Sequence, residues 1–487
     1  AQIIMEKSMS YLKFVKHIFT VGFLDLLGVV QGLVFLSLIT KILGAEDYGV
    51  WSQIMVTMSL IVSFTFLGLH EALIRFIPGE KDKEGVKEGV YSSLVLVLGI
   101  NLIIALFLII FSGYLSIFLK FDQIFIRLLS LIIIFESLNT IFLVVIRAKK
   151  EIGKYFWFVS FKMFLEIGLL IAMVLLGYGL FGAILSFLFI RIIIFLILFF
   201  YIIKKIGFKL PNFSLVKKYL FFGFPTIADG FSYWMITSFD RYLIGFFLGI
   251  VFVGYYAPAY SIAYILSIFI FPLSFVLSVV LPKFFDENKI NEVKNYLQYS
   301  LKYFLAIIIP ATFGVSILSK QLLIIFSTKE IANNAYFVVP FIAVSIFLYG
   351  VSYFFSQILI LVKKTKVIAS IWTIAAFLNL GLNIIFIPIF GILGAAITTL
   401  IAYFCAFILM YYFAFREFQF KIEWNFIFKI FIASVFMSFS ILYLNLQGIA
   451  GLMLLILSGV IIYLFLMILL GGLGKKEIIF FKNLLHT

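Results

Sequence analysis

Long apolar runs constrain this chain more than any other feature. Fourteen stretches of about twenty residues are each long enough to cross ~30 Å of hydrocarbon as a helix. The runs are continuously apolar rather than alternating, which favours helices over a membrane β-barrel. The expected spans are 18–40, 50–77, 90–112, 124–146, 155–176, 179–202, 218–239, 252–281, 298–318, 335–361, 367–388, 391–415, 425–446 and 449–473.

Composition supports the same class of protein. Hydrophobic residues make up 64% of the chain and charged residues only 12%, whereas soluble domains have about half and a quarter. A water-soluble fold this apolar would lack the polar residues needed to cover its surface. We therefore expect an all-α polytopic membrane protein surrounded by lipid.

The distribution of basic residues predicts the orientation. A net charge of +15 would suggest nucleic-acid binding in a soluble protein. Here, with a cytoplasmic N-terminus, 27 Lys and Arg residues fall in inside segments and five in outside loops. This bias follows the positive-inside rule for an even number of spans. We expect both termini in the cytoplasm, an inner (cytoplasmic) membrane location and no nucleic-acid partner.

Several classes of site are disfavoured by what the chain lacks. The single cysteine, Cys405, lies inside an expected span, which argues against a disulfide framework or a metal cluster. The chain has no G-x-x-x-x-G-K-[ST] motif for nucleotide binding, and no loop exceeds about twenty residues. We therefore expect no enzyme activity, no catalytic residue and no metal or organic cofactor.

The sequence contains an internal repeat. Leu43-Gly44 followed by Gly49 recurs 205 residues later as Leu248-Gly249 followed by Gly254. Further matches in the same order, at offsets of 204 to 214, are Asp25 with Asp229, Pro78 with Pro282, Gly179 with Gly391 and Lys149-Lys150 with Lys363-Lys364. Because six spans separate each pair, the repeats have the same orientation, and an axis along the membrane normal would relate them.

The repeat predicts the domain organisation. We expect an N-terminal six-helix bundle at 1–203, a cytoplasmic linker at 204–217, a second six-helix bundle at 218–415, and two further helices with a tail at 416–487. Two similar bundles can rock about a central site, which favours transport. The alternative is a duplicated scaffold without a cavity.

The motifs around the repeat resemble a known family. They are Leu43-Gly44-Ala45-Glu46-Asp47-Tyr48-Gly49, Ser238-Phe239-Asp240-Arg241-Tyr242 and Val253-Gly254-Tyr255-Tyr256, with Leu281-Pro282 after the eighth span. They are similar to the polysaccharide flippases of the multidrug/oligosaccharidyl-lipid/polysaccharide exporter superfamily. The resemblance covers spans 1 to 12.

The resemblance implies a Wzx-type flippase. Such a protein is a V-shaped pair of bundles that moves a polyprenyl-pyrophosphate-linked oligosaccharide from the cytoplasmic to the outer leaflet by alternating access. An ion gradient or downstream polymerisation would drive it, which implies polysaccharide polymerase or assembly proteins as partners. A small-molecule cation exporter of the same superfamily is the alternative. A membrane glycosyltransferase or polymerase is disfavoured because the outside loops are short and nearly uncharged.

Ionisable residues at membrane depth are candidates for the site because each is costly there. Arg191 lies far from either end of the sixth span, and guanidinium binds phosphate oxygens with two parallel hydrogen bonds. The alternative is an ion pair with Glu136. Lys162 is a second phosphate ligand, unless it pairs with Glu166 one turn away. Both glutamates are also candidates for ion coupling or gating.

Asp25 and Asp229 occupy equivalent positions in the first helix of each repeat. They are candidates for binding a coupling H⁺ or Na⁺, or else cap local kinks. His70 could carry a proton because its pKa lies near neutrality, or could hydrogen-bond between helices. Glu71 and Arg75 are one turn apart, so an internal ion pair is favoured over a coupling role for Glu71 or a substrate role for Arg75.

Two further groups lie near the outer ends of spans seven and eight. Asp240 and Arg241 are expected to fix a short turn and to close an outer gate with a salt bridge. Tyr256 and Tyr260 could stack on sugar rings, although an interfacial aromatic belt is the favoured explanation.

Overall fold

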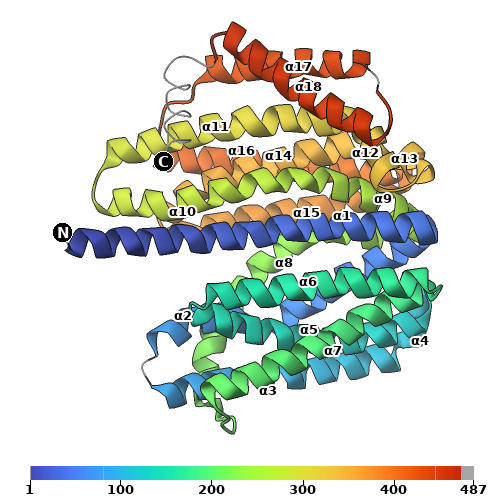
Figure 1. The fold of residues 1–487 in the computed structure, drawn as a ribbon, viewed down its shortest axis with the longest axis vertical. Helices are drawn as coiled ribbons and strands as arrows, with labels where there is room; N and C mark the ends of the chain where they lie inside the picture. Colours follow the sequence, from blue (N-terminus) through green and yellow to red (C-terminus); the bar gives the residue numbers. More distant parts are fainter. Residues whose placement is uncertain (1, 81, 445, 473–487) are drawn as a thin grey trace. The chain divides into compact units, whose positions relative to one another are not determined.

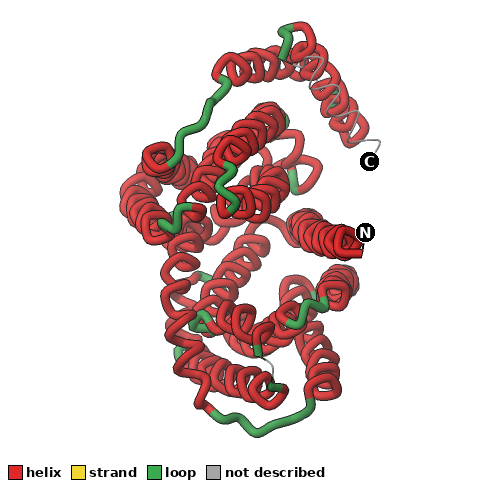
Figure 2. The backbone as a smooth tube through the Cα atoms, turned by 90° about the vertical axis from the view of Figure 1, so that its left-hand side faces the viewer, coloured by secondary structure: helices red, strands yellow, loops and turns green. Residues whose placement is uncertain are grey.

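The computed structural model describes residues 2–80, 82–444 and 446–472, which form helices joined by short loops without a strand among them (Figures 1 and 2). Within these residues, 12 helices are long and apolar enough to span a membrane. The expected all-α polytopic class is therefore confirmed, and the chain is a multi-pass membrane protein. The count of fourteen spans stays a prediction.

Two helices account for the difference between twelve and fourteen. The first spanning segment, Gly22–Thr65, has 44 residues, or about 66 Å at 1.5 Å per residue, which is twice the thickness of the hydrocarbon core. It is divided at Gly44, whose φ of 89° is not helical. Helix α8 (Val216–Phe247) has 32 residues but includes side chains outside the described residues.

Contacts divide the chain into two compact units: unit 1 comprises Ala1–Ala257 and Asn383–Gly391, and unit 2 comprises Pro258–Leu382 and Ile392–Thr487. This grouping differs from the expected boundary at 204–217, because α8 packs against α1 and α2. The predicted bundles remain a hypothesis about which parts move together.

Unit 1 is built from helices of the first half and from α8 (Figure 1). Its elements are α1 (Gln2–Thr65), α2 (Leu69–Phe76), η1 (Ile77–Gly79), α3 (Lys83–Ile110), α4 (Ser112–Leu119), α5 (Gln123–Ala148), α6 (Ile152–Leu175), α7 (Gly179–Ile206), η2 (Phe213–Leu215), α8 and the start of α9 (Ile250–Tyr264). Helix α5 is central, since it packs against α1, α2, α3, α6 and α7. Phe142 and Val145 of α5 are buried with Ile194 and Leu198 of α7.

Unit 2 contains the remaining helices, except that the end of α15 from Asn383 onward belongs to unit 1. They are η3 (Ile265–Phe269), α10 (Ile270–Asp286), α11 (Ile290–Ile317), α12 (Ser319–Phe326), α13 (Lys329–Ala335), α14 (Val338–Leu361), α15 (Thr365–Phe390), α16 (Ile392–Glu417), α17 (Trp424–Leu444) and α18 (Gly448–Leu469). Helix α14, the repeat counterpart of α5, is again central and packs against α10, α11 and α16.

The two repeats share unusual backbone conformations at matching positions. Gly44 and Gly249 have φ of 89° and 108°, and Gly179 and Gly391 have 56° and 63°. Glycine suits these positions because it has no Cβ to clash at positive φ. The glycines that revealed the repeat in the sequence thus have a shared structural cause.

At a third matching position both repeats have a lysine instead of glycine, and the backbone pairs Lys150 with Lys363, which corrects the expected match of Lys149-Lys150 with Lys363-Lys364 by one residue. Lys150 and Lys363 have φ of 60° and 61°. Each lysine ends its helix in the same way. The backbone N–H of Glu151 donates to the carbonyl of Ile146, and the backbone N–H of Lys364 donates to the carbonyl of Leu359. This is the 6→1 bond of a Schellman motif.

The repeat motifs around Gly49 and Gly254 contact each other within unit 1. A Cβ on Gly49 would overlap the carbonyl oxygen of Ile250, and a Cβ on Gly254 would overlap that of Ala45. Because Ala45 and Ile250 are also repeat equivalents, each motif makes the same contact with the other. Such reciprocal contacts arise about a two-fold axis.

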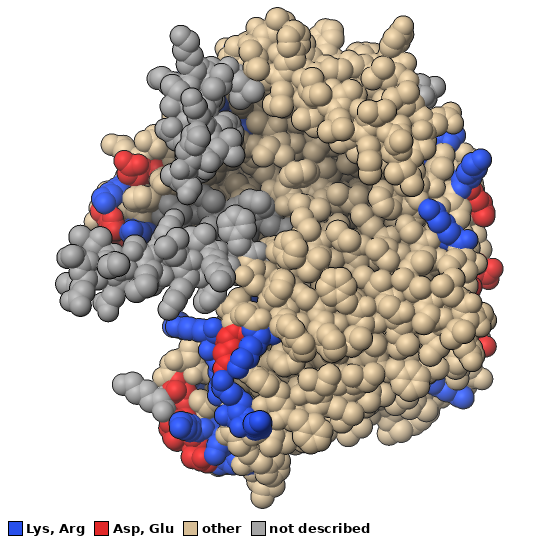
Figure 3. Space-filling model, viewed as in Figure 1, with Lys and Arg blue, Asp and Glu red and all other residues tan. Residues whose placement is uncertain are grey.

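On the face drawn in Figure 3, charged side chains gather near α2 and the start of α3, others stand at the opposite edge, and the surface along the helices between them is uncharged. Lys209 contributes to this group through ion pairs of 3.4 Å with Glu84 and 3.8 Å with Glu88. An uncharged surface along the helices is what contact with lipid requires.

Candidate functional site

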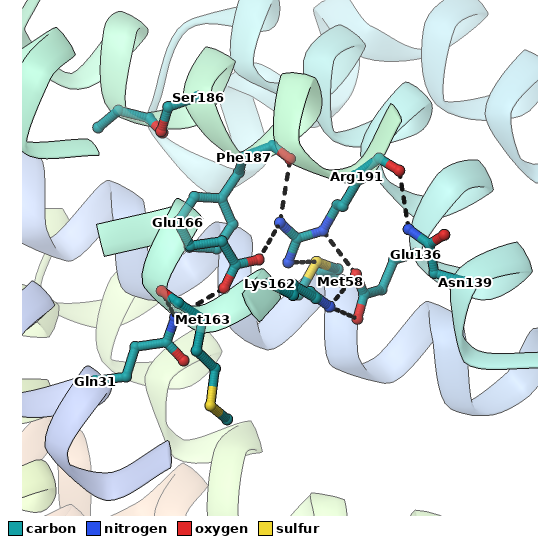
Figure 4. Close-up of polar contacts among 11 residues, drawn as sticks. Gln31, Met58, Glu136, Asn139, Lys162, Met163, Glu166, Ser186, Phe187 and Arg191 are labelled. Carbon is teal, nitrogen blue, oxygen red and sulfur yellow. Dashed lines mark hydrogen bonds and ion pairs between the residues drawn. The ribbon is translucent and has the colours of Figure 1, made fainter. Parts of the chain in front are cut away.

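A buried cluster of four charged side chains lies in the interior of unit 1 (Figure 4). Arg191 of α7, with only 3% of its side chain exposed, lies between two carboxylates: Nε is 2.8 Å from Oε2 of Glu136, and Nη1 is 2.9 Å from Oε1 of Glu166. Lys162 of α6 completes the cluster, with Nζ 2.8 and 2.9 Å from the two carboxylate oxygens of Glu136. We call these four residues the charge tetrad.

Uncharged groups complete the surroundings of the charge tetrad. Gln31 of α1 donates from Nε2 to Oε2 of Glu166 at 2.8 Å. The guanidinium of Arg191 lies 4.5 Å from the centre of the Phe187 ring, a cation–π distance. Asn139 of α5 donates its amide to the backbone oxygen of Arg191 at 2.9 Å. The charge tetrad thus joins α1, α5, α6 and α7.

The charge tetrad is electrically neutral, with two cations and two carboxylates. Removing charged groups from water is costly, and a buried ion pair often adds no stability relative to an apolar pair of similar size. Exposure is unequal: 14% for Lys162 and 17% for Glu136, against 3% for Arg191. Lys162 and Glu136 therefore form the more accessible edge.

The second repeat has no charge at the equivalent positions. At offsets of 213 and 212, Glu136, Glu166 and Arg191 correspond to Tyr349, Asn379 and Tyr403. The rings of Tyr349 and Tyr403 lie 5.7 Å apart, edge to face, and Trp372 lies 5.8 Å from Tyr349. Lys162 corresponds to Ala375. The same region of the repeat can therefore be packed without charges.

The structure shows how the predicted cations are paired. The ion pair between Arg191 and Glu136 is present, as one interpretation of the sequence allowed. Lys162 pairs with Glu136 on α5 rather than with Glu166 on its own helix, because the oxygens of Glu166 already accept bonds from Arg191 and Gln31. The expected i, i+4 pair of Lys162 is therefore wrong.

The expected ion pair between Glu71 and Arg75 is also absent from the described residues. Glu71 instead lies 3.5 Å from Nε2 of His70, and these side chains are 48% and 38% exposed. Arg75 is exposed at the end of α2. Glu71 and Arg75 are one turn apart as expected, yet they lie on a short helix. Helix α2 has only 8 residues and begins after a break at Gly68.

Asp240 and Arg241 are both buried. Asp240 accepts a hydrogen bond from the hydroxyl of Tyr256 at 2.5 Å and another from the backbone N–H of Arg241 at 2.8 Å. Tyr256 is 0% exposed, so neither expected role for it, sugar stacking or an interfacial belt, fits. Tyr260 is 5% exposed and stacks on Tyr264.

Asp25 is half-buried on α1, and the described residues show no ion pair to it. The side chain of Asp229 lies outside the described residues. Sequence reasoning missed Gln31, whose signal was a lone amide at membrane depth.

A second charge cluster lies at the ends of α5, α6 and α7. Glu151 pairs with Lys205 at 2.6 Å and with Lys154 at 3.1 Å, and it accepts a bond from Tyr201 at 2.7 Å. Partial burial favours a higher pKa, but these hydrogen bonds outweigh it and lower the pKa of the Glu151 carboxyl to about 2.

The chain matches relatives of known description. Over 195 residues it is 24% identical to a probable low-salt glycan biosynthesis flippase, Agl15, of Haloferax volcanii. This match spans 40% of the chain and 41% of the relative, less than half of either.

Solved structures share the fold. A structure of the lipid II flippase MurJ in an inward closed conformation gives a TM-score of 0.75 at 20% identity, covering 96% of this chain and all of that one. An inward-facing multidrug resistance transporter of the MATE family, in the MOP superfamily, gives 0.65 at 17% identity, with coverage of 80% and 93%.

Family profiles agree with the expected resemblance. The MatE profile matches residues 225–385. The profile described as polysaccharide biosynthesis protein matches residues 14–287, which is more than half of the chain. The chain therefore belongs to the polysaccharide biosynthesis protein family of multi-pass membrane proteins.

Proposed function

We propose that this protein is a flippase for a polyprenyl-pyrophosphate-linked oligosaccharide. It moves this substrate from the cytoplasmic to the outer leaflet of the cytoplasmic membrane by alternating access, without enzyme activity, and with both termini in the cytoplasm. Family membership supports the proposal, as do the described role of Agl15 and the fold shared with MurJ. A polymerase or other assembly protein would then receive the product.

The main support for the proposal is that the charge tetrad has no charged counterpart in the second repeat. Tyr349, Asn379 and Tyr403 fill the equivalent positions, so packing does not require charge there. Burying four charged groups without a stability gain is a feature of functional sites. The two cations suit a pyrophosphate, which offers only acceptor oxygens and negative charge.

The geometry suggests how a pyrophosphate could bind. Lys162 and Glu136 form the more exposed edge, so the substrate would first displace Glu136 from Lys162 and then reach Arg191. Once displaced, Glu136 would take up a coupling ion, H⁺ or Na⁺. Glu166 stays bound to Gln31 and holds Arg191 in place.

The other sequence candidates have supporting roles in this proposal. Asp25, Asp229, His70 and Glu71 are further groups for the coupling ion. Arg75, exposed at the end of α2, would attract the anionic headgroup before it enters.

Transport in liposomes tests the proposal. The double variant Lys162→Met with Glu136→Gln removes one cation and one anion, so the cluster keeps zero net charge. The matched control is Lys302→Met with Glu423→Gln, an ion pair of 3.0 Å in unit 2 whose lysine is 8% exposed. We expect the first variant to lose flipping of a fluorescent polyprenyl-pyrophosphate oligosaccharide and the control to retain it. If the Lys162→Met, Glu136→Gln variant flips the substrate as fast as the control, the proposal is contradicted.

A cation exporter is the second candidate because the MatE profile matches 225–385 and MATE transporters share the fold. Such a protein would expel tetraphenylphosphonium from cells. Efflux of this cation by the wild type, without flipping of the lipid-linked oligosaccharide, would favour the exporter.

A further inference from the structure

A cavity of about 580 Å³ lies inside unit 1, apart from the charge tetrad. Its walls come from the part of α1 that follows Gly44 and from α2, α5 and α8. The volume falls within the ~300–1,000 Å³ range of small-molecule sites. Its lining includes Ser63, Phe64, His70, Glu71, Thr140, Phe231 and Trp234.

Aromatic rings form one wall of the cavity. Phe231 and Trp234 of α8 are stacked at 10° with centroids 6.2 Å apart, and Phe64 of α1 lies 5.3 Å from Phe231. Phe64 is 39% and Phe231 36% exposed. The cavity is therefore lined in part by large aromatic rings, of which Phe64 and Phe231 are the more exposed.

Polar groups in the lining make a lipid tail a poor occupant. Glu71 and His70 line the cavity with 48% and 38% of their side chains exposed. Covering a carboxylate with an apolar chain is costly, so these groups need water or a polar ligand. The cavity is thus a place for an amphipathic molecule with apolar faces and polar edges.

The hydrogen-bonding groups of the cavity are mainly acceptors, and the exception is the imidazole of His70, which carries an N–H donor. Ser63 donates its hydroxyl hydrogen to the Ser59 carbonyl, and Thr140 donates to the Glu136 carbonyl, each at 2.8 Å. The indole N–H of Trp234 donates to the Ser59 hydroxyl at 3.2 Å. The remaining capacity of these hydroxyls, and all of the capacity of the Glu71 carboxylate, is to accept.

Such a cavity matches a ligand that donates several hydrogen bonds and has flat apolar faces. Sugar rings have hydroxyl donors around their edges and C–H faces that pack on aromatic rings. A pyrophosphate fits poorly, because it only accepts hydrogen bonds, is repelled by Glu71 and would find its donor in the single imidazole of His70. An organic cation would use the rings and Glu71 but would leave the hydroxyl acceptors unused.

We propose that this cavity binds the sugar portion of the substrate, separately from the charge tetrad, which binds the pyrophosphate. This inference rests on the proposed function. It assigns sugar recognition to Phe231 and Phe64 in place of the buried Tyr256, and it moves Glu71 from the coupling-ion candidates to the sugar site.

Two substrates that differ only in the sugar test the assignment. Full-length protein in liposomes is given polyprenyl pyrophosphate either bare or carrying a neutral N-acetylhexosamine trisaccharide. We expect Phe231→Ala to slow flipping of the glycosylated lipid by about tenfold relative to the bare lipid. The Lys162→Met, Glu136→Gln variant should slow both lipids equally. Phe221→Ala is the matched control, since Phe221 is on the same helix, 86% exposed and outside this cavity.

The possible results separate the two hypotheses. If wild type flips both lipids and Phe231→Ala slows them equally, or slows neither, the sugar assignment is wrong and the proposed function stands. If wild type flips neither lipid, the proposed function fails. Efflux of tetraphenylphosphonium that is lost in Glu71→Gln would instead identify the cavity as a cation site.

Discussion

Replacing Arg191 alone and replacing the whole charge tetrad should have opposite effects on stability. Arg191→Met leaves Glu136 and Glu166 with only Lys162 to balance them in the interior. Breaking a buried ion pair in this way costs about 3–5 kcal/mol. Because Arg191 is 3% exposed and contacts both carboxylates, we expect the upper part of this range.

The neutral replacement removes all four charges together. It combines Arg191→Met with Lys162→Met, Glu136→Gln and Glu166→Gln, which have similar volumes. Replacing a complete buried ion network with neutral groups is often neutral or stabilising by about 1–4 kcal/mol. We therefore expect this variant to be at least as stable as the wild type but inactive in flipping.

Thermal unfolding in detergent, followed by the loss of monodisperse protein in size-exclusion chromatography, measures stability. Flipping in liposomes measures function. If the neutral variant unfolds as early as Arg191→Met, the charge tetrad is needed for the fold. If the neutral variant flips substrate at the wild-type rate, the charges have no role in transport.

Four further predictions concern other parts of the chain. Gly68→Ala should reduce expression strongly, since Gly68 has φ of 74° and a Cβ there would overlap the backbone of Gly223; Gly99→Ala, with open space around it, is the control for expression level. Tyr256→Phe removes a hydrogen bond to buried Asp240 and should lower thermal stability by about 1–3 kcal/mol. Lys364→Glu should cost up to about 1 kcal/mol of unfolding free energy, and adding Glu417→Lys should restore it. The pKa of Glu151 is depressed from 4.5 to about 2, so its stabilisation is present at neutral pH and should be lost as pH falls from about 4.5 to about 2; Glu151→Gln should remove that part of the pH dependence of the unfolding temperature.

The helices and the repeat could be predicted because their causes are local. Long apolar runs form helices in lipid whatever their neighbours, and glycines such as Gly44 and Gly249 show where the backbone leaves the helix. Sequence also identified Arg191 and Lys162, since charges at membrane depth are rare. These features depend on composition or on a few adjacent residues.

Partners between helices could not be predicted in the same way. Lys162 has two carboxylates within reach, and its pairing with Glu136 follows from the use of Glu166 by Arg191 and Gln31. Tyr256 looks like an interfacial residue in the sequence, yet its hydroxyl is held by buried Asp240. Such choices depend on how helices far apart in sequence pack.

Comparison of the two repeats distinguishes charges that serve the fold from charges that serve function. At the ends of spans five and six, Glu151 pairs with Lys205 in unit 1, and the equivalent residues in unit 2, Lys364 and Glu417, pair at 2.7 Å with the signs reversed. The scaffold therefore needs opposite charges at that place but not a particular sign on either helix. Inside the bundle the situation differs, because the second repeat packs its interior with aromatic and amide groups where the first has the charge tetrad. Charges that one repeat omits altogether are not required by the architecture that both repeats share. Their presence in the first repeat alone supports the proposal that Lys162 and Arg191 act on the substrate.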